Sequence, residues 1–326
     1  MKIVFTRKIP TELVEPLKEK YDIFMWDREN EPMPHERLLQ EMKDADAVFT
    51  NVADRIDKQL IEQSSSLKVI STMAVGYDNI DVEAATARGI AVGHTPGVLT
   101  EATADLTFTL LVATSRRVVE GMDLIRRNEW QSWGPFLLTG QSLYKATIGI
   151  IGMGRIGQGV ARRAKGFEMN ILYHNRSRKP EAEAELGAVY CSLEELLQQA
   201  DYVVLLAPST PETKNMISHE QFEMMKETAV FINTSRGTNV DEEALYQALK
   251  EEKIFAAGLD VFETEPISND HPLLTLNNVI ALPHIGSANV ETRMKMATLA
   301  IENIEKGLAG ERLTHIVNAE IYGKGK

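Results

Sequence analysis

Short apolar runs alternate with longer amphipathic stretches along almost the whole chain. The first hundred residues contain five candidate strands, at Lys2–Thr6, Asp22–Met25, Ala47–Thr50, Val69–Thr72 and Ile90–Gly93. Six more lie between Thr147 and His284, with the sequences TIGIIG, NILYH, YVVLLAP, AVFINTS, AAGLDV and VIALPH. Brief, continuously apolar strands separated by helices are typical of a parallel sheet covered on both faces. We therefore predict an α/β protein with two doubly wound parallel sheets, one of about five strands and one of about six.

Two long helical patterns bear on the domain organisation. Thr100 is a plausible N-cap for a helix from about Glu101 to Arg127, whose apolar early part (ADLTFTLLVAT) predicts burial under a sheet or against another subunit. The pattern at Asn289–Leu308 predicts a second long helix. If that helix returns to the first domain, the first domain is discontinuous. If it stays with the second domain, the two domains are consecutive, and the periodicity leaves both arrangements open.

Composition narrows the function classes. The chain has 326 residues, enough for two domains, and 35 Lys+Arg against 47 Asp+Glu give a net charge of −12. This balance argues against non-specific binding to nucleic acid or anionic membranes. The single cysteine, Cys191, excludes an intramolecular disulfide, and no Cys/His spacing indicates a metal site. Without an apolar stretch of about 20 residues or a signal-peptide core at the start, we expect a soluble, cytoplasmic protein.

A glycine motif, Gly152-Met-Gly154-Arg-Ile-Gly157, gives the strongest local signal. It follows an apolar run and opens a helical stretch, the setting in which such glycines bind a dinucleotide. There Gly152 makes the tight turn, Gly154 lets the pyrophosphate approach the backbone, and Gly157 lets helix and strand pack closely. The phosphates would lie at the positive end of the helix dipole.

The end of the next strand bears on which dinucleotide binds. An NAD site usually has an acidic residue there for the ribose hydroxyl, but residues 174–179 (HNRSRK) contain no carboxylate. Arg176, with Arg178 or Lys179 nearby, could pair with a 2′-phosphate through charge-assisted hydrogen bonds. A solvated loop is the alternative. The position favours NADP(H) as the preferred cofactor, with NAD(H) possible.

Three polar residues follow predicted parallel strands, namely Arg236, Glu265 and His284. Ligands of doubly wound sheets bind outside the carboxyl ends of the strands, so the three could converge on one crevice. Singly, each has an ordinary structural explanation, such as a surface cation, a loop carboxylate or a buried imidazole. Together they provide what hydride transfer to a 2-oxo acid needs: a bidentate cation for the carboxylate, an acid/base and a carboxylate to orient it.

Six motifs identify a family when taken in order. The chain resembles the D-isomer-specific 2-hydroxyacid dehydrogenases, most closely the branch of glyoxylate/hydroxypyruvate reductases and 2-ketogluconate reductases. The motifs are VGYDNID (75–81), TPGVLTEATAD (95–105), GIIGMGRIG (149–157), NTSRG (233–237), GLDVFETEP (258–266) and LPHIGSA (282–288).

The resemblance implies a domain organisation and a set of roles. A discontinuous flavodoxin-like substrate domain would hold residues 1–99 and 288–326, and a Rossmann nucleotide domain would hold residues 100–287. The long helix after Thr100 would face the partner of a homodimer. The implied roles are carboxylate and carbonyl binding for Arg236, acid/base for His284 and its partner for Glu265, with the backbone N–H groups of Val75 and Gly76 completing the carboxylate site. Asp260 would contact the nicotinamide carboxamide, and Arg155 with Ile156 the pyrophosphate.

Two departures from the family pattern and several rival functions accompany this interpretation. His94 stands where Asn is more usual, without an evident reason, and Asn175 replaces the ribose-binding Asp, which favours NADP. Formate dehydrogenases carry Gln at the position of Glu265, and phosphoglycerate dehydrogenases are a further alternative within the fold. A nucleotide-sensing binding protein, like the corepressors built on this fold, is the alternative from another class. We expect a reductase of small 2-oxo acids such as glyoxylate, hydroxypyruvate or 2-ketogluconate, with Trp130 and Trp133 at a substrate site or a dimer interface.

Overall fold

Two parallel sheets organise the protein, which we describe from a computed structural model over residues 1–323. Contacts divide the chain into two compact units. Unit 1 consists of Met1–Leu99 and the segment from Asn289 onward, and unit 2 of Thr100–Ala288. Every strand pair in both sheets is parallel, so the predicted α/β fold with two doubly wound sheets is confirmed.

Unit 1 has a five-stranded sheet in the order β2-β1-β3-β4-β5, a doubly wound arrangement of the flavodoxin type. Its strands are β1 (Lys2–Phe5), β2 (Asp22–Met25), β3 (Ala47–Thr50), β4 (Val69–Thr72) and β5 (Ala91–Gly93). The connecting helices are α1 (Thr11–Val14), η1 (Glu15–Leu17), α2 (His35–Met42), α3 (Lys58–Gln63) and α4 (Val82–Ala87). Strands β1, β3, β4 and β5 are buried on both faces, which explains their apolar sequences, whereas the edge strand β2 is only partly buried.

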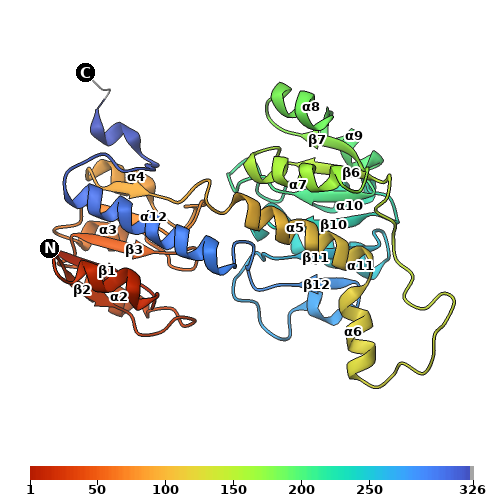
Figure 1. Cartoon of the computed structure of the whole chain (residues 1–326), viewed down its shortest axis with the longest axis horizontal. Coiled ribbons are helices and arrows are strands. Elements are labelled where there is room, and N and C mark those ends of the chain that lie inside the picture. Colours follow the sequence, from red (N-terminus) through yellow and green to blue (C-terminus); the bar gives the residue numbers. More distant parts are fainter. Residues whose placement is uncertain (324–326) are drawn as a thin grey trace. The chain divides into compact units, whose positions relative to one another are not determined.

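The C-terminal segment completes unit 1. Helix α12 (Val290–Leu308), which Asn289 caps through its side chain, packs on β3 and β4, as Figure 1 shows for the blue helix. After it, Val317 N donates to Val92 O at 2.8 Å, and η4 (Ala319–Tyr322) follows. Unit 1 is therefore built from both ends of the sequence.

Unit 2 has a seven-stranded sheet in the order β12-β11-β10-β9-β6-β7-β8. The strands are β6 (Thr147–Ile151), β7 (Asn170–His174), β8 (Val189–Tyr190), β9 (Tyr202–Leu205), β10 (Val230–Asn233), β11 (Ala256–Leu259) and β12 (Val279–Ala281). The helices are α5 (Thr100–Ser115), α6 (Val118–Arg126), α7 (Arg155–Lys165), α8 (Pro180–Leu186), α9 (Leu193–Gln199), α10 (His219–Met224), η2 (Gly237–Asn239), α11 (Glu242–Lys250) and η3 (Pro272–Thr275). All six predicted strands are present, and the two-residue β8 is additional. The reversal of strand order beside β6 is the switch point at which doubly wound sheets bind ligands.

One predicted helix is broken into two. The pattern at residues 101–127 predicts a single helix, whereas α5 ends at Ser115 and α6 begins at Val118. Between them Arg117 has a left-handed backbone (φ 53°), and Gln141 N donates to Ser115 O at 2.9 Å. A Cβ on Gly140 would lie only 2.1 Å from that carbonyl oxygen, so the returning chain occupies the path of a continuous helix. Helix α5 is buried as expected, against α7, β10 and β11.

Candidate functional site

The glycine motif forms the turn between β6 and α7. Gly152 has φ 106°, a conformation that favours glycine, and a Cβ there would lie 2.7 Å from the carbonyl carbon of Leu206. A Cβ on Gly157 would lie 2.3 Å from Gly152 O, so the helix can approach the strand only with glycine at this position. Gly154 is the N-cap of α7, and no atom lies within 4 Å of its Cβ position. The geometry fits a dinucleotide, because the first N–H groups of α7, at Arg155 and Ile156, lack acceptors within the helix and are donors of the kind that bind phosphate.

The end of β7 adjoins this turn. Asn175 Oδ1 accepts a hydrogen bond from Met153 N at 3.0 Å, so this side chain fixes the glycine turn. Arg178 is paired with Glu183, with Nη2 2.5 Å from Oε2, and its guanidinium lies over the ring of Tyr190. Arg176 is exposed and forms no ion pair with any residue in the described part of the chain. Of the two arginines, Arg176 is thus the one available to a ligand.

His284 and Glu265 form a hydrogen-bonded pair at the carboxyl end of the second sheet. His284 Nδ1 lies 2.7 Å from Glu265 Oε2, and the other carboxylate oxygen accepts from Phe262 N at 3.0 Å. Burial opposes the charge of Glu265, but the hydrogen bond and charge of His284 hold the pKa of this carboxyl below its usual value, with smaller contributions from Phe262 N–H and Arg236. The side chains are 28% and 35% exposed, so the imidazole can reach a substrate while a carboxylate orients it.

Asp260 accepts two hydrogen bonds from the loop that carries His284. This carboxylate, 2% exposed, accepts from Ile285 N and from Gly286 N, both at 2.7 Å. Burial raises the pKa of Asp260, although the two N–H donors partly offset that effect. His284 itself has φ 54°, a left-handed conformation that costs energy in a non-glycine residue. The two hydrogen bonds beyond it hold this backbone in place, a positioning contact that the sequence did not indicate.

Arg236 follows β10 in a loop that its neighbours define. Asn233 Nδ2 donates to Arg236 O at 3.0 Å, and Asn233 Oδ1 accepts from the backbone N and the hydroxyl of Ser235. The next residue, Gly237, packs so closely on the loop after β11 that a Cβ would lie 1.8 Å from the carbonyl carbon of Phe262. The half-buried Arg236 is thereby brought close enough to Glu265 to lower the pKa of that carboxyl. In the sequence, Asn233 of the NTSRG motif was the residue that could have indicated how the Arg236 loop is held.

The remaining predicted residues, Val75 and Gly76, lie in unit 1, three and four residues after β4. Unit 2 thus holds Arg236, Glu265 and His284 together at the ends of β10, β11 and β12. The backbone N–H groups that are predicted to bind the substrate carboxylate belong to unit 1. Within residues 1–323, no cluster of His, Cys, Asp or Glu has the arrangement of a metal site. Across the same residues, none of the helices has the length and apolar character needed to span a bilayer.

Comparison with known proteins identifies the family. Residues 108–286 match the sequence profile described as D-isomer specific 2-hydroxyacid dehydrogenase, NAD binding domain. The chain belongs to the D-isomer specific 2-hydroxyacid dehydrogenases. It is an NAD(P)-dependent oxidoreductase of this family, as the resemblance in sequence implied.

Individual members of the family resemble the chain over nearly its full length. A glyoxylate reductase of Pyrococcus furiosus is 49% identical, over 98% of this chain and 96% of the relative. Among solved structures, a protein from Thermus thermophilus is 44% identical with a TM-score of 0.91, covering 97% of this chain and all of the other. An NADPH-dependent glyoxylate/hydroxypyruvate reductase of Sinorhizobium meliloti, solved with NADP and malonate, is 33% identical with a TM-score of 0.85, covering 98% and 97%.

Proposed function

We propose that this dehydrogenase reduces glyoxylate and related small 2-oxo acids to D-2-hydroxy acids, with NADPH as the preferred hydride donor. The observation that carries the proposal is the His284–Glu265 pair, which holds a proton donor at the strand ends beside Arg236. The 49% identity to a glyoxylate reductase supports glyoxylate as a substrate. Hydroxypyruvate and 2-ketogluconate are further candidates in the same substrate class.

Each residue has a defined part in the proposed reaction. The planar guanidinium of Arg236 binds the carboxylate and the carbonyl oxygen of the 2-oxo acid, and the N–H groups of Val75 and Gly76 also donate to the carboxylate. When bound, NADPH supplies the hydride that adds to the carbonyl carbon. His284 gives its proton to the carbonyl oxygen as negative charge develops there, and Glu265 stabilises the imidazolium before the transfer.

The glycine turn and its neighbours hold the cofactor in this proposal. The N–H groups of Arg155 and Ile156 bind the pyrophosphate at the start of α7. Each oxygen of Asp260 has a second lone pair beyond the one used by the loop N–H groups, and that pair accepts from the nicotinamide carboxamide. In this proposal the cofactor lies across the switch point beside β6.

Preference for NADPH rests on Arg176 and Asn175. Arg176 is available for the 2′-phosphate, and Asn175 offers no carboxylate to repel it. Arg176→Ala should weaken NADPH binding by roughly 1.5–3 kcal/mol and leave NADH binding nearly unchanged. Arg178→Ala is the matched control, because Glu183 already neutralises Arg178. Equal losses for both cofactors in Arg176→Ala would contradict the assignment.

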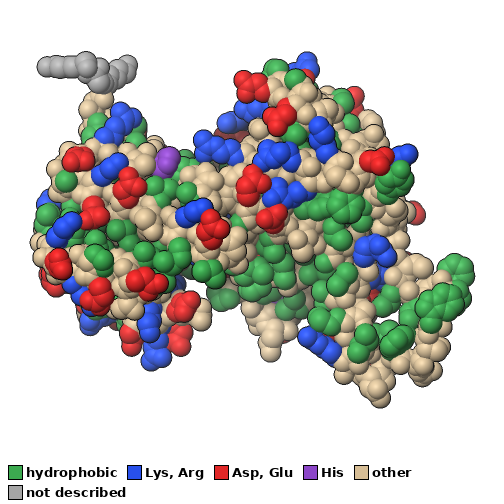
Figure 2. Space-filling model, viewed as in Figure 1, with side chains coloured by type: hydrophobic (Ala, Val, Ile, Leu, Met, Phe, Trp, Pro, Cys, Tyr) green, Lys and Arg blue, Asp and Glu red, His purple; other side chains and the backbone are tan. Residues whose placement is uncertain are grey.

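A homodimer is the proposed assembly, formed through α6 and the segment 128–144. None of the residues of α6 is buried, and Val118, Met122 and Ile125 expose apolar side chains. Figure 2 shows hydrophobic side chains gathered in this region, at the lower right. Trp133 and Phe136 are about four-fifths exposed, at 79% and 83%. An apolar surface of this kind marks an interaction site, and a second copy is the partner that this family implies.

Sedimentation velocity tests the assembly. Trp133→Ser with Phe136→Ser should shift the protein from dimer to monomer without loss of NADPH binding. The control, Val290→Ser, changes an exposed apolar residue (84%) of unit 1 and should leave the dimer intact. A monomeric wild type would overturn the proposed assembly.

The reaction itself is tested by following NADPH oxidation with glyoxylate, hydroxypyruvate and 2-ketogluconate, and NADH oxidation in parallel. We expect turnover on glyoxylate and faster turnover with NADPH. Oxidation of 3-phosphoglycerate with NAD in place of these activities would indicate a phosphoglycerate-type enzyme. Tight NADPH binding without turnover on any 2-oxo acid would indicate a nucleotide-sensing protein. We place the enzyme in the cytoplasm, where NADPH is supplied and its lone Cys191 stays reduced.

A further inference from the structure

Two successive carbonyl groups just beyond β4 are bound by one neighbouring segment of unit 1. Thr95 N donates to Ala74 O at 2.7 Å, and His94 Nδ1 lies 3.0 Å from Val75 O. A carbonyl oxygen only accepts, so this contact requires the proton of the imidazole on Nδ1. Residues 94 and 95 follow β5, which neighbours β4 in the sheet. The end of one strand thus holds the backbone that leaves the adjacent strand.

This arrangement fixes the direction of two N–H groups. A trans peptide is planar with its N–H opposite its C=O, so each bound carbonyl directs the next N–H away from residues 94 and 95. The N–H groups concerned are those of Val75 and Gly76, and neither donates to another residue of the described chain. Adjacent N–H groups on one side of the backbone form a concavity that binds anions. A hydrogen bond on the preceding carbonyl also polarises each peptide and strengthens its N–H as a donor.

We propose that His94 is a positioning residue that holds the amides of Val75 and Gly76 ready for the carboxylate of the substrate. The inference rests on the proposed function, in which these amides bind that carboxylate. It assigns a role to the histidine that departs from the more usual Asn at this position. Both side chains carry a nitrogen directly on Cγ, so the Nδ2 of Asn and the Nδ1 of His lie at the same distance along the side chain.

His94 is itself held from two directions. Its backbone N donates to His315 O at 3.2 Å, and the buried Asn303 of α12 donates from Nδ2 to His94 O, also at 3.2 Å. Asn303 Oδ1 in turn accepts from His315 N at 3.1 Å. The imidazole meets the rings of Tyr77 and His315 edge-on, with centroids 5.7 and 6.5 Å away. The side chain therefore has little freedom to leave Val75 O.

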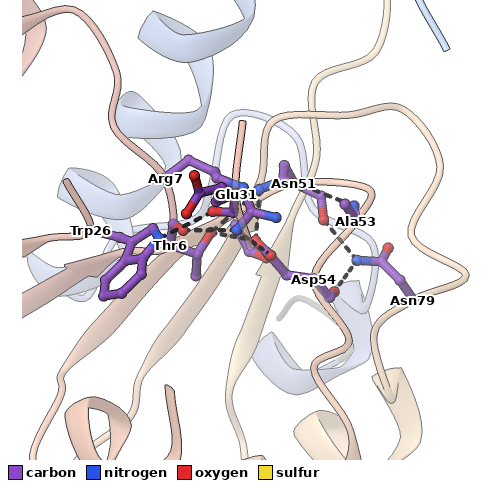
Figure 3. A network of polar contacts seen from close by, with 9 residues as sticks. Thr6, Arg7, Trp26, Glu31, Asn51, Ala53, Asp54 and Asn79 are labelled. Atoms are coloured by element: carbon purple, nitrogen blue, oxygen red, sulfur yellow. Dashed lines mark hydrogen bonds and ion pairs between the residues drawn. The ribbon is translucent and has the colours of Figure 1, made fainter. Parts of the chain in front are cut away.

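The far end of the same loop is tied down by Asn79, which Figure 3 shows beside the turn after β3. Asn79 Nδ2 donates to Asn51 O at 2.8 Å and to Asp54 O at 2.6 Å. That turn is anchored by the buried Asp54, whose carboxylate pairs with Arg7 at 2.7 Å and accepts from Asn51 Nδ2 at 2.6 Å. The segment from Ala74 to Asn79 is thus fixed at both ends, and His94 supplies the side-chain contact on the peptide that carries the Gly76 N–H.

Three variants separate the hydrogen bond from the ring. His94→Phe keeps an aromatic ring against Tyr77 but cannot donate to Val75 O. His94→Asn keeps a donor at the same position and loses the ring. His315→Phe is the matched control, because it removes a neighbouring histidine that does not bind Val75 O.

Steady-state kinetics with NADPH and glyoxylate give the first readout. One hydrogen bond corresponds to a rise of about three- to tenfold in the KM for glyoxylate in His94→Phe. The KM for NADPH and the Tm should match those of His315→Phe, and His94→Asn should restore the KM to within about twofold of wild type. A wild-type KM in His94→Phe, or a His94→Asn enzyme as impaired as His94→Phe, would overturn the proposal.

Calorimetry with oxalate gives a readout that needs no turnover. Oxalate is a dicarboxylate without a ketone or aldehyde carbon, so the enzyme cannot reduce it by hydride addition. In the NADPH-bound protein, the Kd of oxalate should rise by the same factor in His94→Phe and recover in His94→Asn. Oxalate binding without turnover in the wild type would overturn the proposed reductase and leave the role of His94 to be decided by the variants. Equal oxalate affinity in the wild type and His94→Phe would refute that role.

Discussion

Replacing Glu265 with Gln tests whether a carboxylate keeps the catalytic imidazole charged. The amide keeps an acceptor for Phe262 N but removes the negative charge 2.7 Å from His284 Nδ1. Two unit charges about 4 Å apart interact by about 4 kcal/mol at an effective dielectric constant of about 20. Because the two side chains are 28% and 35% exposed, solvent screens this interaction, and we expect no more than roughly 1 kcal/mol of it to remain.

The direction of the change in kcat/KM with pH depends on which protonation form of His284 is active. Reduction needs the imidazolium, so kcat/KM falls as rising pH removes its proton. Because the pKa of Glu265 is lowered, this carboxyl is ionised at every pH above its usual value, so it supports the imidazolium throughout the neutral range. In Glu265→Gln the alkaline limb should therefore lie at lower pH, and kcat/KM at neutral pH should drop by up to roughly fivefold.

The assay is a pair of pH–rate profiles for glyoxylate reduction at saturating NADPH. Glu263→Gln serves as the control, since it removes an exposed carboxylate two residues away whose side chain does not contact His284. Its profile should coincide with that of the wild type. If the limb of Glu265→Gln also coincides with the wild type, Glu265 does not support the charge of His284 and the acid/base pair is wrongly assigned.

Three further predictions concern the surroundings of this pair. Asp260→Asn should lower kcat/KM, with a rise in activation free energy of roughly 1–3 kcal/mol, because an amide nitrogen would face one of two N–H donors. Because the pKa of Asp260 is raised, the wild type should lose stability as pH rises through that pKa, and Asp260→Asn should not, which thermal unfolding against pH would detect. Arg236→Lys should retain NADPH binding but lose most of kcat/KM, since an ammonium cannot make the paired contacts of a guanidinium, and near-normal turnover would refute its role. Gly237→Ala should lower the Tm by roughly 3–10 °C through overpacking against Phe262, whereas Gly154→Ala, with open space, should not.

Much of the fold follows from local signals in the sequence. Strands buried on both faces have no polar alternation, so runs such as YVVLLAP identify them directly. The glycines at 152 and 157 are dictated by a positive φ and by close packing, which is why the motif could be interpreted without the structure. The grouping of Arg236, Glu265 and His284 was predictable for a different reason, because parallel strands bring their carboxyl ends to one edge of the sheet.

What the sequence did not indicate depends on contacts between distant residues. The break at Arg117 is imposed by Gly140 and Gln141, where the chain returns to the end of α5. The helical periodicity of residues 101–127 does not indicate this break. The two-residue β8 is too short to give a pattern. His94 had no interpretation because its acceptor, Val75 O, lies on the loop after another strand.

The return of the C-terminal segment to unit 1 has a consequence for how the molecule is made. Residues 1–99 emerge from the ribosome first, yet β3 and β4 lack the cover of α12, and β5 lacks Val317 and Asn318, until the whole of residues 100–288 has been synthesised. Unit 2 is continuous and has all its contacts available earlier. We therefore expect the middle of the chain to become protease-resistant during synthesis before the beginning does. A nascent chain released at residue 288 should contain a folded nucleotide unit behind an N-terminal segment whose apolar sheet face is still open to chaperones.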